Sequence, residues 1–350
     1  MSNKFDLQRL IRPNVAKLTP YSSAREEFKM ENLETIFLDA NENPYDTELN
    51  RYPDPEQLDV KSELAKSHNI TTDNVLLGNG SDEILDLLIR AFCEPATDAI
   101  IILPPTYGMY GVLAETNNIE IIEILLGNDF EPKVDAILER VTSETKLIFL
   151  CSPNNPTGNS FSEEKIETIL NSFKGLVVID EAYIEFSNSE SWISRSSQYS
   201  NLVVIRTFSK AYGLAGIRLG ACYASSEIIS VLKKIKPPYN VNTVTQRRAL
   251  HALANRKKLA TEVEEIKVQR MSLMAQFEDI RCIVKIYHSD ANFILVAMDD
   301  ARHRYHQLLA AGVVVRYRGQ EPLCKNTLRI TIGNPAENKK LIQVLKRLKP

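Results

Sequence analysis

The sequence predicts an α/β fold: a large domain with a mostly parallel central sheet and helices on both faces, plus a smaller α+β domain. Between about residues 75 and 225, short apolar runs rich in β-branched residues alternate with helical patterns. Continuous apolar runs indicate strands that are covered on both faces, as in parallel sheets. After about residue 235 the pattern changes to a long charged helix and short strands. At roughly 150 residues per domain, a chain of 350 residues is expected to form two domains.

Six apolar runs are expected to form the large sheet. They span residues 74–77, 99–103, 146–150, 176–180, 202–206 and 220–224. In such sheets the active groups gather beyond the carboxyl ends of the strands. Polar residues, glycines and prolines follow four of these runs, in the segments 103–107, 151–158, 180–183 and 206–210. The sequence therefore predicts that the catalytic and binding residues lie in these four segments.

A break over residues 236–240 follows the last of these strands, because regular helix cannot continue through two adjacent prolines. Beyond it we expect a helix over 243–279, strands at 291–297, 312–317 and 327–333, and helices near 300–311 and 336–348. The expected boundaries are 36–245 for the large domain and 246–350 for the small domain. Residues 1–35 are expected to form an N-terminal arm or to join the small domain.

Composition and charge argue against several classes of function. Apolar residues make up 44% of the chain and charged residues 25%, as in an ordinary soluble globular protein. The net charge of −3 argues against nucleic acid or an anionic membrane as partner, since either favours a basic face. Neither a signal peptide nor a membrane-spanning apolar run is visible. Five scattered cysteines without a C-x-x-C pair predict no zinc site and no structural disulfide, which fits the cytoplasm.

Asp180, Tyr183 and Lys210 form the first candidate site. Asp180 closes an apolar strand, where a charged side chain is costly unless it is paired. Tyr183 follows three residues later, and Lys210 follows the next strand. Pyridoxal phosphate needs a lysine amine for its Schiff base, and a carboxylate that keeps the ring nitrogen protonated. It also benefits from a phenol at the ring oxygen. Each residue alone would be unremarkable, but together they predict a pyridoxal-phosphate site anchored on Lys210.

A phosphate cradle is expected in residues 78–83, Gly-Asn-Gly-Ser-Asp-Glu, which lead into an apolar helical pattern. Glycines let backbone N–H groups approach an anion, and a helix N-terminus favours negative charge. The alternative is that Ser81 or Asp82 simply caps the helix. Further donors for the same anion lie on both sides of Lys210: Thr207, Ser209 and Arg218.

Two further strand-end residues face the same cofactor in this interpretation. The ring of Tyr107 can stack on the pyridine, although a tyrosine in this position is more often part of a core. The amide of Asn155 can donate to the ring oxygen, although Asn, Pro and Gly in 155–158 also suit a plain turn.

Three motifs together resemble the fold-type-I aminotransferases of the aspartate aminotransferase superfamily. They are Asn155-Pro156-Thr157-Gly158, Asp180-Glu181-Ala182-Tyr183 and Ser209-Lys210-x7-Arg218. The resemblance runs from about residue 36 to 333 and implies a fold-type-I pyridoxal-phosphate transferase. Within the superfamily the chain is most similar to the histidinol-phosphate aminotransferases. This closer likeness rests on the segments 38–44, 51–54, 91–95, 104–110, 180–186 and 328–333.

The resemblance implies a reaction and a role for each site residue. Histidinol phosphate and 2-oxoglutarate would exchange an amino group for a keto group in histidine synthesis. Lys210 would form the Schiff base and move the proton, Asp180 would pair with the ring nitrogen, and Tyr107 would stack on the ring. Around these lie the ring-oxygen and phosphate ligands: Tyr183, Asn155, Ser81, Asp82, Thr207, Ser209 and Arg218. Tyr52 would reach the phosphate from the other subunit, which implies a homodimer.

The resemblance also implies a pocket for substrate anions. Arg329 would bind the α-carboxylate of glutamate or the substrate phosphate, with Arg316 and Tyr21 assisting and Asn292 nearby. Planar guanidinium binds both kinds of anion, which suits a pocket that must accept either one. Arg318 adds a second charge beside Arg316, so the division of anion contacts between these two stays open.

Three alternative functions stay open. Threonine-phosphate decarboxylases look alike but break a different bond, and aromatic-amino-acid aminotransferases differ only in the side-chain pocket. Some transcription regulators use an aminotransferase-like domain as a sensor. They need a DNA-binding module, whereas only about 35 residues precede the first core strand and the net charge is negative.

Overall fold

The computed structural model describes residues 5–20 and 36–348. Its large sheet has seven strands in the order β1-β7-β6-β5-β4-β2-β3. The strands are β1 (Val75–Gly78), β2 (Ala99–Ile102), β3 (Glu120–Glu123), β4 (Thr145–Cys151), β5 (Leu176–Asp180), β6 (Leu202–Thr207) and β7 (Gly220–Ala224). Only β7 within this sheet runs antiparallel, pairing with both β1 and β6. The predicted mostly parallel sheet is confirmed.

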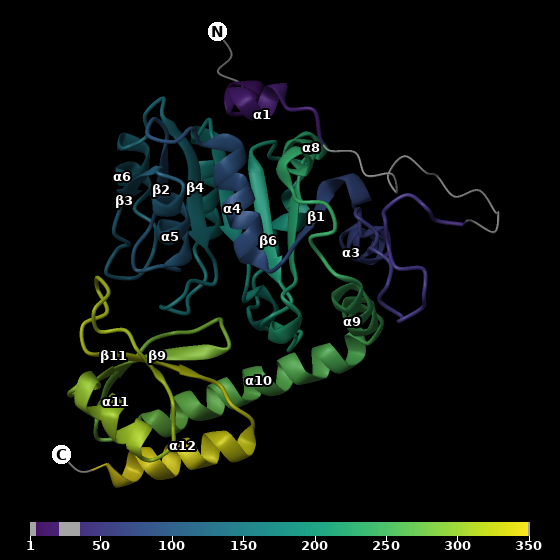
Figure 1. Ribbon diagram of the computed structural model, residues 1–350. Coiled ribbons are helices and arrows are strands. Elements are labelled where there is room, and N and C mark those ends of the chain that lie inside the picture. Colours follow the sequence, from purple (N-terminus) through teal and green to yellow (C-terminus); the bar gives the residue numbers. More distant parts are fainter. Residues whose placement is uncertain (1–4, 21–35, 349–350) are drawn as a thin grey trace.

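Helices cover both faces of this sheet, as Figure 1 shows. One face carries α1 (Pro13–Lys17), α4 (Ser81–Phe92), α5 (Met109–Thr116) and α8 (Ser226–Ile235). The other carries α3 (Leu58–His68), α6 (Val134–Glu139), α7 (Glu163–Ser172) and α9 (Thr243–Ala254). Short 3-10 helices are η1 (Leu7–Arg9), η2 (Thr72–Asn74), η3 (Ile184–Phe186), η4 (Trp192–Arg195) and η5 (Ala215–Ile217).

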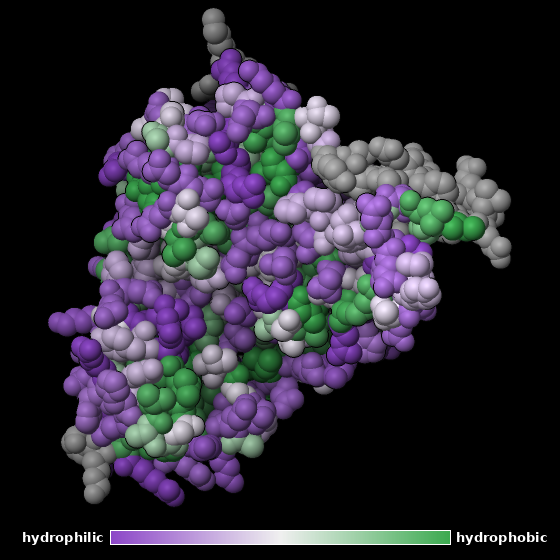
Figure 2. Space-filling model, in the orientation of Figure 1, coloured by the Kyte–Doolittle hydropathy of each residue, from purple (hydrophilic) through white to green (hydrophobic). Residues whose placement is uncertain are grey.

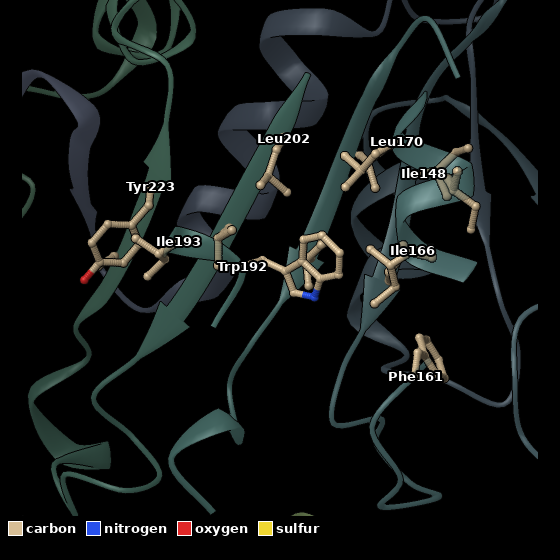
Figure 3. Close-up of a cluster of buried hydrophobic side chains, with 14 of the residues drawn as sticks. Ile148, Phe161, Ile166, Leu170, Trp192, Ile193, Leu202 and Tyr223 are labelled. Atoms are coloured by element: carbon tan, nitrogen blue, oxygen red, sulfur yellow. The ribbon is translucent and has the colours of Figure 1, made fainter. Parts of the chain in front are cut away.

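Alternation along each strand divides the apolar side chains between two cores. On β4, Ile148 and Leu150 pack on the α7 side, whereas Leu147 and Phe149 pack on the α4 side. Successive side chains of a strand point to opposite faces, so a strand buried on both faces must be apolar throughout. Figure 3 shows part of the α7-side core, where Trp192 lies among side chains from the strands and α7.

A second, four-stranded antiparallel sheet forms in the C-terminal part, in the order β10-β11-β9-β8. Its strands are β8 (Ile283–Ile286), β9 (Phe293–Met298), β10 (Arg316–Tyr317) and β11 (Thr327–Thr331). Three helices pack with it: α10 (Arg256–Phe277), α11 (Ala301–Ala310) and α12 (Pro335–Arg347). In Figure 1, α10 runs from α9 beneath this small sheet. The small α+β unit is therefore confirmed as a part of the fold.

Some elements differ from the prediction. The helix expected over 243–279 is two helices, because Asn255 breaks it with φ −103° and ψ 38° and its side-chain amide bonds the carbonyl of His251 at 2.6 Å. Asparagine side chains compete with the backbone in this way and so disfavour helix interiors. The strand expected over 312–317 forms only at its last two residues. No helix within residues 5–20 and 36–348 has the length and apolar character needed to cross a membrane.

Candidate active site

A cavity of about 410 Å³ lies where the carboxyl ends of β4, β5 and β6 meet the edge of the small sheet. It is lined by Ser81, Asp82, Tyr107, Cys151, Asn155, Asp180, Ala182, Tyr183, Thr207, Ser209, Lys210, Ala215, Arg218, Arg316, Arg318 and Arg329. The structure thus brings together all four predicted strand-end segments and the two predicted arginines. We call this cavity the central pocket.

Asp180 lies deep in the central pocket at the last position of β5, with an exposed fraction of 3%. Its Oδ1 accepts the backbone N–H of Ala182 at 3.1 Å, and its Oδ2 accepts the hydroxyl of Tyr110 at 2.7 Å. Burial raises the pKa of the Asp180 carboxyl to about 6, while the two hydrogen bonds act in the opposite direction. A carboxylate held in this way is a strong partner for a buried protonated nitrogen.

Lys210 follows β6 and opens onto the central pocket, where its Nζ lies 5.6 Å from the ring centroid of Tyr183. Loss of hydration and then the charge of Arg329 lower the pKa of this amine. A lowered pKa increases the share of neutral amine, which is the nucleophilic form. The Tyr183 hydroxyl has a raised pKa, chiefly through burial, so it stays a neutral donor.

One end of the central pocket is built to receive an anion. Gly80 is the N-cap of α4, and no side chain caps this helix, so the alternative in which Ser81 or Asp82 provides a side-chain cap is wrong. A Cβ added to Gly80, whose φ is 81°, would lie 2.8 Å from Nη2 of Arg218. A Cβ added to Gly220 would lie 2.5 Å from the backbone nitrogen of Ser81. The two glycines therefore allow the loop, the helix N-terminus and the arginine to approach one another closely.

Side chains around this end are held in place by their neighbours. The Arg218 Nη2 lies 3.5 Å from Oδ2 of Asp82, and Oδ1 of Asp82 accepts the Tyr107 hydroxyl at 3.0 Å. Thr207 is buried, and its hydroxyl accepts the backbone N–H of Ser209 at 3.1 Å. Hydrogen-bond donors from the N-terminus of α4, from residues 207–209 and from Arg218 therefore meet at this end of the central pocket.

The other end of the central pocket is cationic. Arg316 and Arg329 are paired across β10 and β11, so both project from the same face of the small sheet. Arg329 donates to Oδ1 of Asn155 at 2.5 Å and lies 5.2 Å from the ring centroid of Phe293. Burial and then the charge of Arg318 lower the pKa of Arg329, as expected where like charges crowd.

Arg318 lines the same end, but its charge is partly balanced. Its Nη1 lies 2.5 Å from Oε1 of Glu321, three residues further along the chain. Glu321 is not among the residues that line the central pocket, whose acidic side chains within the described part of the chain are Asp82 and Asp180. Glu321 therefore pairs with Arg318, and Arg316, Arg318 and Arg329 all line the cavity.

Two predicted site residues within the described part of the chain, Tyr52 and Asn292, do not line the central pocket. Tyr52 lines a separate cavity with Arg51, Asn242 and others, and its ring stacks on Tyr239 at 4.6 Å. Asn292 is half-buried, and its carbonyl accepts the backbone N–H of Ile332 at 2.9 Å. Tyr21 lies outside the described residues.

The sequence reasoning missed Tyr110, which bonds Asp180 from behind the pocket wall. Its closeness to Tyr107 in the sequence was the available signal, since Tyr110 lies in the first turn of the helix that begins at Met109. It also missed Ala182 and Ala215, whose side chains carry no chemistry. Within residues 5–20 and 36–348, no three His, Cys, Asp or Glu side chains form a group that could hold a metal ion.

Comparisons with known proteins agree with this geometry. The family described as aminotransferase class I and II matches residues 27–345. A histidinol-phosphate aminotransferase of Christiangramia forsetii is 58% identical over 344 residues, which is 98% of each chain. The enzyme of the same name from Flavobacterium johnsoniae is 57% identical over 347 residues, or 99% of each chain.

Solved structures give the same result. The histidinol-phosphate aminotransferase from Clostridium acetobutylicum has a TM-score of 0.79 and 25% identity, covering 85% of this chain and 90% of its own. The Sinorhizobium meliloti enzyme of that name, in complex with pyridoxal-5'-phosphate, has a TM-score of 0.78 and 25% identity, covering 85% of this chain and 82% of its own. This chain therefore belongs to the class I and II aminotransferases and, among them, to the histidinol-phosphate aminotransferases.

Proposed function

We propose that this protein is a pyridoxal-phosphate enzyme that transfers an amino group between histidinol phosphate and 2-oxoglutarate, yielding imidazole-acetol phosphate and glutamate. The observation that carries the proposal is the two-ended central pocket. An amine and a buried carboxylate lie on one side, and two arginines project from the small sheet on the other. Such a pocket suits a cofactor with a reactive ring and a substrate with an anionic tail.

The residues present fit pyridoxal phosphate. The phosphate end offers uncapped N–H groups of α4, the hydroxyls of Thr207 and Ser209, and the guanidinium of Arg218. Gly80 and Gly220 leave no room for side chains there, as expected for a site where backbone must approach an anion. Asp180 supplies the buried negative charge that a protonated ring nitrogen requires.

When bound, pyridoxal phosphate supplies an electron sink for the bond that breaks at the α-carbon of the substrate. Asp180 keeps the ring nitrogen protonated by accepting its hydrogen bond. Lys210 anchors the cofactor and then, as an amine of lowered pKa, holds and moves the proton at its Nζ. Tyr183 and Asn155 would hold the ring oxygen, and Tyr107 would pack against the ring.

Substrate anions bind at the arginine end in this proposal. Arg329 and Arg316 form two parallel N–H···O bonds to a carboxylate or a phosphate, which fixes the orientation of the substrate. Glu321 balances Arg318, so Arg318 adds to the field of the pocket but makes no direct anion contact. The proposal also assigns Tyr21 and Asn292 to substrate binding.

We also propose that the enzyme is a cytoplasmic homodimer in which Tyr52 reaches the cofactor phosphate of the partner subunit. Leu49 and Val244 are exposed apolar side chains that line the same cavity as Tyr52, and the exposed Leu38 and Tyr45 precede it in the sequence. Figure 2 shows apolar surface on the segment that follows residue 35. Exposed apolar patches of this kind favour burial by a protein partner. The net charge of −3 supports a small-molecule enzyme without nucleic acid or membrane partners.

Purified protein incubated with pyridoxal phosphate, histidinol phosphate and 2-oxoglutarate should form glutamate. The Lys210→Ala variant is the negative control. Parallel reactions with phenylalanine and with threonine phosphate test the alternative functions. Faster turnover of phenylalanine would favour an aromatic aminotransferase, and carbon dioxide from threonine phosphate without glutamate formation would favour a decarboxylase.

A further inference from the structure

Tyr110 has a fully buried side chain with an exposed fraction of zero, on the first turn of α5. Its ring stacks on Phe149 with centroids 4.9 Å apart, and meets the ring of Tyr107 edge-on at 5.5 Å. These two contacts fix the ring plane and so fix the direction of the hydroxyl. That hydroxyl donates to Oδ2 of Asp180 at 2.7 Å.

We infer that Tyr110 is a positioning residue that keeps Asp180 ionised and oriented for the cofactor ring nitrogen. The inference rests on the proposed function, because this carboxylate matters to the ring only if pyridoxal phosphate binds in the central pocket. Tyr110 acts through Asp180 and does not touch the substrate.

The hydrogen bonds of Asp180 support this role. Its Oδ1 accepts the backbone N–H of Ala182 and its Oδ2 accepts Tyr110, so both oxygens are tethered and the carboxylate plane cannot rotate. A hydrogen bond donated to a carboxylate favours its ionised form. The Tyr110 hydroxyl keeps its proton and stays the donor in this hydrogen bond, because burial and then the charge of Asp180 raise its own pKa.

Other groups around Asp180 do not replace this donor. Cys151 lies beside Asp180 on the neighbouring strand β4, but burial raises the pKa of its thiol and its sulfur donates to the carbonyl of Pro153 at 3.5 Å. The charge of Lys210 favours the Asp180 carboxylate, whereas the charge of Asp82 disfavours it. Tyr110 is therefore the side-chain hydrogen-bond donor to Asp180 among the described residues.

The test is Tyr110→Phe, which keeps both ring contacts and removes only the hydroxyl. Tyr223→Phe is the matched control, since Tyr223 is an equally buried tyrosine in the core on the other face of the sheet. The dissociation constant of pyridoxal phosphate should rise about tenfold to a hundredfold in Tyr110→Phe at neutral pH, as expected for losing a hydrogen bond to a charged group. The weakening should grow as the pH falls, because Asp180 then protonates at a higher pH. The control should bind as the wild type does.

A double-mutant cycle separates positioning from packing. In an Asp180→Asn background, Tyr110→Phe should weaken cofactor binding no further, because no charge remains to be held. The inference would be overturned if the losses of cofactor-binding free energy in the two single variants add up in the double variant. It would also be overturned if cofactor binding by Tyr110→Phe has the same pH profile as binding by the wild type. If Tyr110→Phe fails to fold as judged by urea unfolding, Tyr110→3-fluorotyrosine provides a stronger donor of nearly the same shape. It should move the pH profile to lower pH, and no shift would count against the role. Wild-type protein that does not bind the cofactor through Lys210 would instead refute the proposed function.

Discussion

At the scale of the residue, the central pocket combines groups whose charges are costly to bury. Asp180 is fully enclosed, Lys210 has a lowered pKa, and Arg329 lies close to Arg316 and Arg318. Functional sites collect such perturbed groups because reactivity depends on them. The sequence predicted Asp180 and Lys210 from their types and positions. It could not predict the hydrogen bonds that tune them, since Tyr110 and Asp180 are 70 residues apart.

Lys210→Ala should abolish the visible absorbance of the bound cofactor and reduce turnover by several orders of magnitude, because the nucleophile and the proton carrier are lost together. Absorbance spectra and glutamate formation measure the two effects. Lys174→Ala, which removes an exposed lysine outside the central pocket, is the control and should retain the absorbance. Near-normal turnover in Lys210→Ala would contradict the role of this residue.

Asp180→Asn should stabilise the protein freed of cofactor while weakening its binding of the cofactor. Burial raises the pKa of Asp180 to about 6, so the folded protein favours the protonated carboxyl. This preference adds to the free energy of unfolding fully below the unfolded pKa of about 4, and it is lost as the pH rises through 6. The variant should therefore gain about 3 kcal/mol in free energy of unfolding at pH 8, and almost nothing near pH 4. Urea unfolding at both pH values measures this, and an equal gain at both would contradict it.

At the scale of the element, continuous apolar runs made the strands of the large sheet predictable. The strands β3 and β8 were missed, because β3 has glutamates at both ends and β8 is short with an exposed Val284. Neither shows the pattern of a strand buried on both faces, since each lies at the edge of its sheet. The predicted domain boundary near 245 stays a prediction, although Asn255 marks where the helical direction changes.

The N-terminus of α4 gives a prediction at this scale. Gly80→Ala should lower the free energy of unfolding by about 1 kcal/mol, because φ is 81° there. It should also weaken binding of pyridoxal phosphate, since the new Cβ displaces Arg218. Gly216→Ala is the matched control, because an added Cβ would meet nothing within 4 Å. Cofactor titration and urea unfolding measure both variants, and equal behaviour would argue against the cradle.

At the scale of the whole molecule, the topology explains why residues so distant in sequence meet. Parallel strands bring their carboxyl ends to one edge, and the small sheet presents its arginines to that edge. The sequence predicted this convergence correctly. It could not predict the Arg329–Asn155 and Arg318–Glu321 pairs, because each depends on how the two sheets and the β10–β11 connection pack.

Subunit mixing tests whether Tyr52 serves the partner subunit. Tyr52→Ala and Lys210→Ala should each have low activity as pure dimers. Unfolded together and refolded as hybrids, they should regain activity above the sum of the two, because one site per hybrid then holds both intact residues. Mixing Lys210→Ala with Asp180→Asn is the control, since both residues belong to the same subunit's site in every arrangement and each subunit's site stays defective. No recovery in the first mixture would show that Tyr52 acts within its own chain or not at all.

The division of the central pocket between two sheets also sets an order in time. Every predicted cofactor ligand of the central pocket lies between Ser81 and Arg218, whereas the anion-binding arginines come later, at Arg316 and Arg329. Domains fold from the N-terminal side as a chain leaves the ribosome. The half of the pocket expected to hold the cofactor is therefore synthesised before the half expected to bind the anion of the substrate.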